Sequence, residues 1–98
     1  MANLILHCHG IRSMGNTKDT PLESKIQSRI IKRYEQQGYM VVKLVLTNKP
    51  GIPDLLLLKN GVASFVEVKR PKNKPRPLQL YRMEQLKEQG FEVKVLSE

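Results

Sequence analysis

The dipeptide Asn60-Gly61 constrains the fold of this chain more than any other feature of its sequence. It separates two apolar runs, 54–59 and 62–69. A two-residue type I′ turn favours Asn-Gly because both of its central residues adopt a positive φ. The sequence therefore predicts a β-hairpin built from these two runs.

The register of this hairpin brings three charged side chains together. Counting outward from the turn, Asp54 lies opposite Glu67, and directly opposed residues project from the same face of a sheet. Lys69 shares that face because it follows Glu67 by two positions on one strand. The other residues on this face are apolar: Leu56, Leu58, Ala63 and Phe65. We expect Asp54, Glu67 and Lys69 to converge at one end of the hairpin.

Two opposed carboxylates beside an apolar surface repel each other, and one of them would tend to hold a proton. A divalent cation removes this conflict, and Mg²⁺ prefers hard oxygen ligands while leaving coordination positions for water and phosphate. Lys69 would then orient or activate the attacking water or stabilise the phosphate charge. The pattern leaves one alternative open, an exposed hairpin end in which Lys69 contacts Glu67 and no metal binds.

The remaining segments complete an α/β domain. Thr20-Pro21-Leu22-Glu23 has the pattern of a capping box and predicts a helix over 20–38 that stops at Gly38. The segment 39–47 is apolar at nearly all positions, which is typical of a strand covered on both faces. After the hairpin, a second helix over 78–89 is predicted, with Leu80, Met83 and Leu86 on one side, and then a closing strand over 91–96. The predicted order is α-β-β-β-α-β, a mixed central sheet flanked by helices.

Length and charge narrow the class of protein. A chain of 98 residues holds one domain, and a net charge of +8 makes nucleic acid the leading partner. The single cysteine, Cys8, excludes an intrachain disulfide and fits a reducing, cytoplasmic setting. The apolar runs are far shorter than the ~20 residues that a membrane span needs.

Two loops gather basic residues at the same end of the predicted sheet as Asp54 and Lys69. Phosphate contacts from such loops would be independent of DNA sequence and sensitive to salt. A purely solubilising role is the alternative. The candidate DNA-binding residues are Lys49, Arg70, Lys72, Lys74 and Arg76.

Residues 1–18 form a separate N-terminal segment before a domain over 19–98. It contains a candidate strand at 4–6 and a candidate natural start at Met14, which would make the preceding residues a leader. His7 and His9 alternate around Cys8, but two histidines with one cysteine do not fill a tetrahedral zinc shell, so we expect no metal site there.

The motif residues resemble a known family. Gly51-Ile52-Pro53-Asp54, an apolar strand and Glu67-Val68-Lys69 are similar to the PD-(D/E)xK nuclease signature. With Glu23 on the first helix and Gln79 opening the second, the pattern resembles the virus-type replication–repair nuclease (VRR-NUC) family over residues 22 to about 96.

This resemblance implies roles that the residues alone do not give. Asp54, Glu67 and the backbone carbonyl of Val68 would bind Mg²⁺ or Mn²⁺, and Lys69 would be the catalytic lysine. Glu23 would contact the metal indirectly, through its ligands, or bind a second ion. Gln79 would brace the site or contact substrate. The resemblance also implies hydrolysis of DNA and, from its likeness to the minimal phage members of the family, a homodimer that acts on branched DNA such as four-way junctions. A phage-encoded protein would work in the host cytoplasm.

The prediction is therefore a metal-dependent DNA endonuclease, selective for structure because no base-reading module is evident. The leading rival is a non-catalytic nucleic-acid-binding module that keeps the nuclease fold. A basic ribosomal or RNA-associated protein is a second rival, but it leaves the pairing of Asp54 with Glu67 unexplained. One metal or two remains open.

Overall fold

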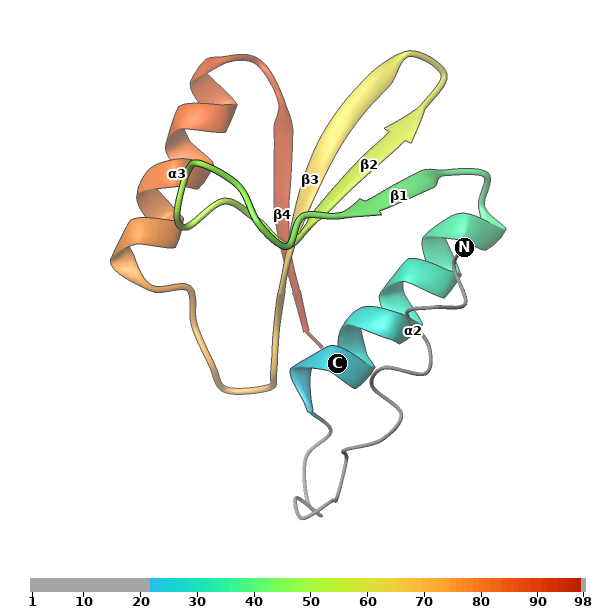
Figure 1. Ribbon diagram of the computed structural model, residues 1–98, viewed down its shortest axis with the longest axis horizontal. Helices are drawn as coiled ribbons and strands as arrows, with labels where there is room; N and C mark the ends of the chain where they lie inside the picture. Colours follow the sequence, from blue (N-terminus) through green and yellow to red (C-terminus); the bar gives the residue numbers. More distant parts are fainter. Residues whose placement is uncertain (1–21, 98) are drawn as a thin grey trace.

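The computed structural model describes residues 22–97, which form two helices and four strands (Figure 1). Their order is α-β-β-β-α-β, as predicted. The predictions for residues 1–18, including the segment around His7 and His9, lie outside the described residues. In chain order the elements are α2 (Glu23–Gln36), β1 (Met40–Lys43), β2 (Leu55–Lys59), β3 (Val62–Lys69), α3 (Pro77–Glu88) and β4 (Glu92–Ser97).

The four strands form one mixed sheet in the order β1-β2-β3-β4. The β1–β2 and β2–β3 pairs are antiparallel, whereas β3 and β4 are parallel. The predicted hairpin register is confirmed, since Lys59 pairs with Val62 and Leu56 with Phe65. The turn is also as predicted, because Asn60 and Gly61 have φ values of 51° and 78°.

The two helices lie on opposite sides of this sheet (Figure 1). Ile26 and Ile30 of α2 are fully buried against side chains of β2 and β3. Because strand side chains alternate between faces, Glu67 and Lys69 point to the other side of the sheet, where α3 lies. None of the helices within residues 22–97 is long and apolar enough to cross a membrane. The buried sheet residues beneath α2 are Leu55, Leu57, Val66 and Val68.

Two boundary predictions at the start of the domain were wrong. Helix α2 begins at Glu23, with Leu22 as its N-cap and no side-chain cap, so Glu23 is not the third residue of a capping box. The Leu22 carbonyl accepts the N–H groups of Lys25 and Ile26 instead. Strand β1 ends at Lys43, and all four of its residues are exposed or half-buried, so it is not covered on both faces.

The face of the second helix also differs from the prediction. Met83 is buried and Leu86 half-buried, but Leu80 is half-exposed. Gln79 turns inward in its place because its side chain is hydrogen-bonded to Glu67. The orientation of the first turn of α3 toward the sheet is therefore determined by a polar contact, not by an apolar stripe.

Candidate metal centre

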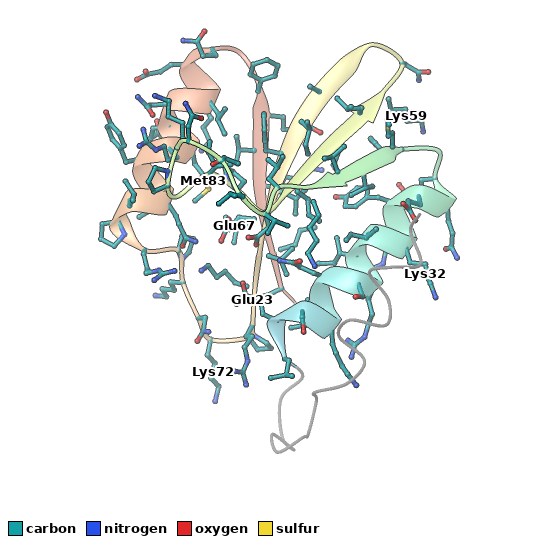
Figure 2. All side chains as sticks on the ribbon, viewed as in Figure 1. Glu23, Lys32, Lys59, Glu67, Lys72 and Met83 are labelled. Atoms are coloured by element: carbon teal, nitrogen blue, oxygen red, sulfur yellow. The ribbon has the colours of Figure 1, made fainter. Side chains whose placement is uncertain are left out.

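Three carboxylates from three separate segments meet at one end of the sheet. Glu23 is the first residue of α2, Asp54 directly precedes β2, and Glu67 lies in β3. Each offers a carboxylate oxygen within 4.8 Å of the other two, the one such cluster found in residues 22–97. Figure 2 shows Glu23 at the start of α2 below Glu67 at the centre of the sheet. The convergence of Asp54 with Glu67 that the register predicted is present.

Asp54 is held by two backbone groups, one in β3 and one directly after β1. Its Oδ2 accepts a 2.9 Å hydrogen bond from the Val68 N–H, and its carbonyl accepts a 2.8 Å bond from the Leu44 N–H. The preceding Pro53 is fully buried. These contacts fix the Asp54 carboxylate beside β3 although Asp54 itself lies outside a strand.

Glu67 is buried, with 1% of its surface exposed, and one of its oxygens lacks a partner. Its Oε2 accepts a 2.9 Å hydrogen bond from Gln79 Nε2 and lies 3.4 Å from Lys69 Nζ. No group within the described residues forms a hydrogen bond with its Oε1. A buried polar atom without a partner is costly, so this oxygen suits a cation.

The surroundings of Glu67 raise its pKa to about 7. Burial is the largest cause, the Asp54 carboxylate is the next, and Glu23 adds to it, while Lys69 acts in the opposite direction. Desolvation and like charges both disfavour the ionised carboxylate. A divalent cation between Asp54 and Glu67 would remove this penalty, so the residues present fit a metal ion.

Lys69 and Gln79 both contact the same oxygen of Glu67, Oε2. Lys69 is 7% exposed, and its ammonium group forms an ion pair with Glu67. Gln79 uses both ends of its amide, because its Oε1 accepts a 2.8 Å bond from the Arg76 N–H while its Nε2 donates to Glu67. The orientation of this amide is thereby fixed.

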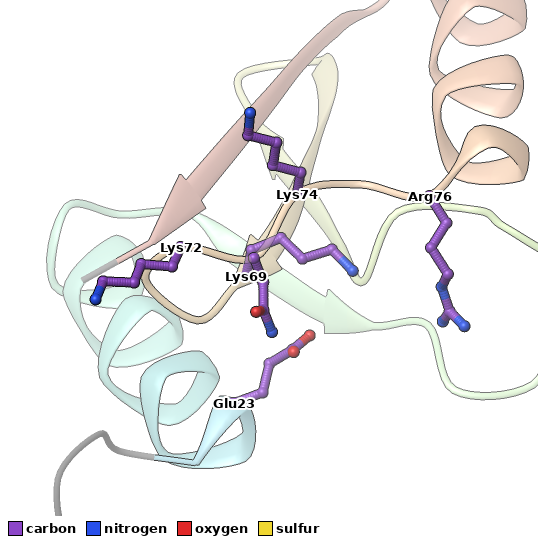
Figure 3. A pocket seen from close by; sticks show the side chains of 6 residues that line it. Glu23, Lys69, Lys72, Lys74 and Arg76 are labelled. Atoms are coloured by element: carbon purple, nitrogen blue, oxygen red, sulfur yellow. The ribbon is translucent and has the colours of Figure 1, made fainter.

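An open cavity of about 560 Å³ adjoins the cluster at Glu23. Glu23 borders it from α2, and Lys69 with the loop after β3 borders it from the other side (Figure 3). A polyanion entering here would meet positive charge directly beside the acidic cluster. The basic residues that line the cavity are Lys69, Lys72, Lys74 and Arg76.

The structure does not bring all the predicted basic residues to this cavity. Lys49 lines a second cavity, of about 280 Å³, together with Arg82 and Gln85 of α3. Arg70 is half-buried after β3 and already takes part in an interaction within the protein. Lys72, Lys74 and Arg76 are therefore the members of the predicted set that line the cavity beside Glu23.

Sequence reasoning missed Arg82. Its Nε donates a 2.8 Å hydrogen bond to the Pro50 carbonyl, which joins α3 to the loop that leads to Asp54. The only sequence signal is its position three residues after Gln79, which puts both on one side of a helix. Nothing in the sequence identified Pro50 as its partner.

The mixed sheet, with Asp54, Glu67 and Lys69 gathered at the end of its central hairpin, defines an α/β domain of the PD-(D/E)xK nuclease class. A model of the VRR-NUC domain family matches residues 39–97. The chain therefore belongs to the VRR-NUC family of nucleases.

Individual relatives agree with this assignment. The chain is 36% identical over 75 residues to "Putative nuclease p44" of Acyrthosiphon pisum secondary endosymbiont phage 1, covering 76% of this chain and 81% of that protein. A solved VRR_NUC domain is similar with a TM-score of 0.69 and 39% identity, covering 76% of this chain and 83% of its own. A second VRR_NUC domain protein, at 19% identity and a TM-score of 0.64 with 76% of each chain covered, shares the fold.

Proposed function

We propose that this nuclease is a divalent-metal-dependent DNA endonuclease that hydrolyses phosphodiester bonds. The observation that carries the proposal is the buried Glu67 Oε1, which lacks a partner and belongs to a cluster of three carboxylates. Basic residues line the cavity beside it, where a phosphate backbone would lie. A metal site next to a phosphate site is the combination that metal-assisted phosphodiester hydrolysis requires.

Asp54 and Glu67 would hold the ion, with the Val68 backbone carbonyl as a third protein ligand. Glu23 would act through a water molecule or at a second ion. Mg²⁺ or Mn²⁺ suits these oxygen donors. When bound, such an ion polarises the scissile phosphate and lowers the pKa of a bound water.

The chain's own residues position the reactants. Lys69 lies beside Glu67, where its ammonium group can orient the attacking water or neutralise charge on the phosphate. Gln79 holds the Oε2 of Glu67 and so leaves the Oε1 available for the ion. Lys72, Lys74 and Arg76 would bind flanking phosphates, and Lys49 and Arg70 would extend this contact.

We further propose branched DNA, such as a four-way junction, as the substrate and a homodimer as the active form. Both described helices pack on the sheet, so neither is presented for reading a DNA groove. A symmetric dimer would carry two cutting sites, matching a junction that must be cut on two strands. Leu80 and Tyr81, exposed apolar neighbours on α3, are candidates for the contact with a second copy. We also propose the cytoplasm as its location, that of the host cell for a phage protein.

A four-way junction and a linear duplex of matched sequence, each incubated with Mg²⁺, test this function. We expect the wild type to cut the junction faster than the duplex, and Lys69→Ala to cut neither. Binding without cleavage by the wild type would favour the rival, a non-catalytic binding module. Cleavage of an RNA junction with the DNA junction intact would overturn the substrate.

The dimer is tested by light scattering on the eluting protein, without and with the junction. A mass of two chains is expected. A single chain bound to a junction that is nevertheless cut on both strands would contradict the dimer.

A further inference from the structure

Asp54 is the only one of the three clustered carboxylates that lies in a loop, so its backbone position depends on how that loop is held. Glu23 lies in a helix and Glu67 in a central strand, so regular hydrogen bonds hold their backbones. Asp54 ends the segment 44–54, which connects β1 to β2 without being a strand. The position of its carboxylate therefore depends on the hydrogen bonds from Val68 and Leu44 and, beyond them, on the contacts that hold the rest of this segment.

Helix α3 holds the segment through Arg82. The Arg82 Nε donates a 2.8 Å bond to the Pro50 carbonyl, and its Nη1 donates a 2.8 Å bond to Gln85 Oε1. The guanidinium also lies 5.4 Å from the centre of the Tyr81 ring. Two of its donor atoms are thus engaged within the protein, so the group is set to hold a carbonyl rather than a phosphate.

The same helix touches the segment one residue later. Gly51 has a φ of +86°, and a Cβ there would lie 2.8 Å from Leu78 Cγ and 3.0 Å from the Leu78 carbonyl oxygen. Only glycine allows the segment to lie this close to α3. Three residues further on, beyond the buried Pro53, the chain reaches Asp54.

We propose that Arg82 is a positioning residue of the metal site, acting through the Pro50 carbonyl on the segment that carries Asp54. Gln79, three residues earlier on α3, holds Glu67 directly. One helix therefore braces both of the carboxylates proposed to bind the metal, and Arg82 adds to the Val68 hydrogen bond in holding Asp54 beside Glu67. This inference rests on the proposed metal-dependent function.

The proposal predicts a dependence on the size of the ion. Mg²⁺ demands near-ideal octahedral geometry at short distances, whereas Ca²⁺ accepts longer and more irregular coordination. A displaced Asp54 should therefore weaken Mg²⁺ binding more than Ca²⁺ binding. If the Arg82–Pro50 contact mattered only for overall stability, its loss would lower the melting temperature without weakening Mg²⁺ binding more than Ca²⁺ binding.

The test is calorimetric titration of Mg²⁺ and of Ca²⁺ into the metal-free full chain, below its melting temperature. Arg82→Ala should weaken Mg²⁺ binding by about tenfold, the scale of outer contacts at metal sites, and leave Ca²⁺ affinity nearly unchanged. Its control is Lys87→Ala, which removes an exposed positive charge from the same helix. DNA affinity, measured with Ca²⁺ so that no cutting interferes, should equal that of the wild type in both variants.

Gly51→Ala tests the same contact from the loop side. Its control is Gly61→Ala, which imposes similar backbone strain at φ +78° but meets no atom within 4 Å. Gly51→Ala should lose Mg²⁺ affinity and Gly61→Ala should keep it. Combining Arg82→Ala with Gly51→Ala should add little further loss, because both disturb the packing of the same segment on α3.

Equal Mg²⁺ affinity in the wild type and Arg82→Ala would overturn the role of Arg82 alone, whether or not the melting temperature falls. Lower DNA affinity with unchanged Mg²⁺ binding would make Arg82 a DNA contact instead. A wild type that binds neither cation would overturn the metal site itself, and with it this proposal.

Discussion

Gln79 Nε2 donates a 2.9 Å hydrogen bond to Glu67 Oε2, and this bond joins the first turn of α3 to the centre of the sheet. The Gln79 Oε1 is occupied by the Arg76 N–H, so the amide has one orientation. Glu67 is therefore held by one oxygen while the other remains without a protein partner. The bond occupies Oε2 and leaves Oε1, the proposed metal ligand, unblocked.

Removing this bond should weaken the metal site. Gln79→Ala frees Glu67 to rotate, so we expect metal affinity and cutting rate to fall about 10–100-fold, the usual effect of losing a group that orients a ligand. Titration with Mn²⁺ and single-turnover cleavage measure the two quantities. Glu84→Gln, on the exposed side of the same helix, is the control. Unchanged Mn²⁺ affinity in Gln79→Ala would contradict the role.

Neutralising either proposed metal-binding carboxylate should abolish cutting. Asp54→Asn and Glu67→Gln keep the side-chain shape but remove the negative charge that binds the ion, so DNA binding should remain largely intact. Cleavage of the junction and its binding without metal are the measurements. Equal turnover in the wild type and these variants would remove both residues from the mechanism.

The stability of the metal-free protein should fall as the pH rises towards 8. The folded state keeps the Glu67 proton up to about pH 7, whereas the unfolded chain loses it near the ordinary pKa of 4.5. The Glu67 proton therefore contributes its full stabilisation of the folded state below pH 4.5, and this contribution is lost as the pH rises through 7. The difference in pKa corresponds to about 3 kcal/mol.

Chemical denaturation at pH 4.5 and pH 8 measures this change. Glu67→Gln has no such proton, so it should lack this contribution and be more stable than the wild type at pH 8 without metal. A wild type and a Glu67→Gln variant with the same pH profile would show that Glu67 ionises normally.

Divalent cations should restore the folding stability that the metal-free protein loses at high pH. At pH 8, Mg²⁺ at a hundred times its dissociation constant should stabilise the wild type by about 2.7 kcal/mol, because it binds the folded state. Asp54→Asn should show little of this effect in a thermal melt. An equal Mg²⁺ response in both proteins would place the binding elsewhere.

Neutralising Lys72 and Lys74 together should weaken DNA binding and flatten its dependence on salt. Each lost phosphate contact lowers the slope of log affinity against log salt by about 0.9 for duplex DNA. The comparison is Lys87→Ala, at the opposite end of α3 from this loop. A slope equal to that of the wild type would count against phosphate contacts by these lysines.

Local sequence predicted the hairpin and much of the site because a two-residue turn fixes a register. The position of Asp54 relative to Glu67 then followed by counting, and the short segment from Glu67 to Lys69 needed no long-range information. The first helix was less well predicted. Thr20 to Glu23 has a capping-box pattern, but the helix begins at Glu23, whose side chain joins the carboxylate cluster instead.

The chain by itself determined the order of elements, the turn at Asn60-Gly61 and the charges that alternate along β3, since these depend on neighbours a few positions apart. Only the tertiary structure decided that Gln79 grips one oxygen of Glu67 and that Arg82 holds the carbonyl of Pro50. Those contacts join residues separated by 12 and 32 positions. They exist because α3 packs on the face of the sheet opposite α2, which no local pattern specifies.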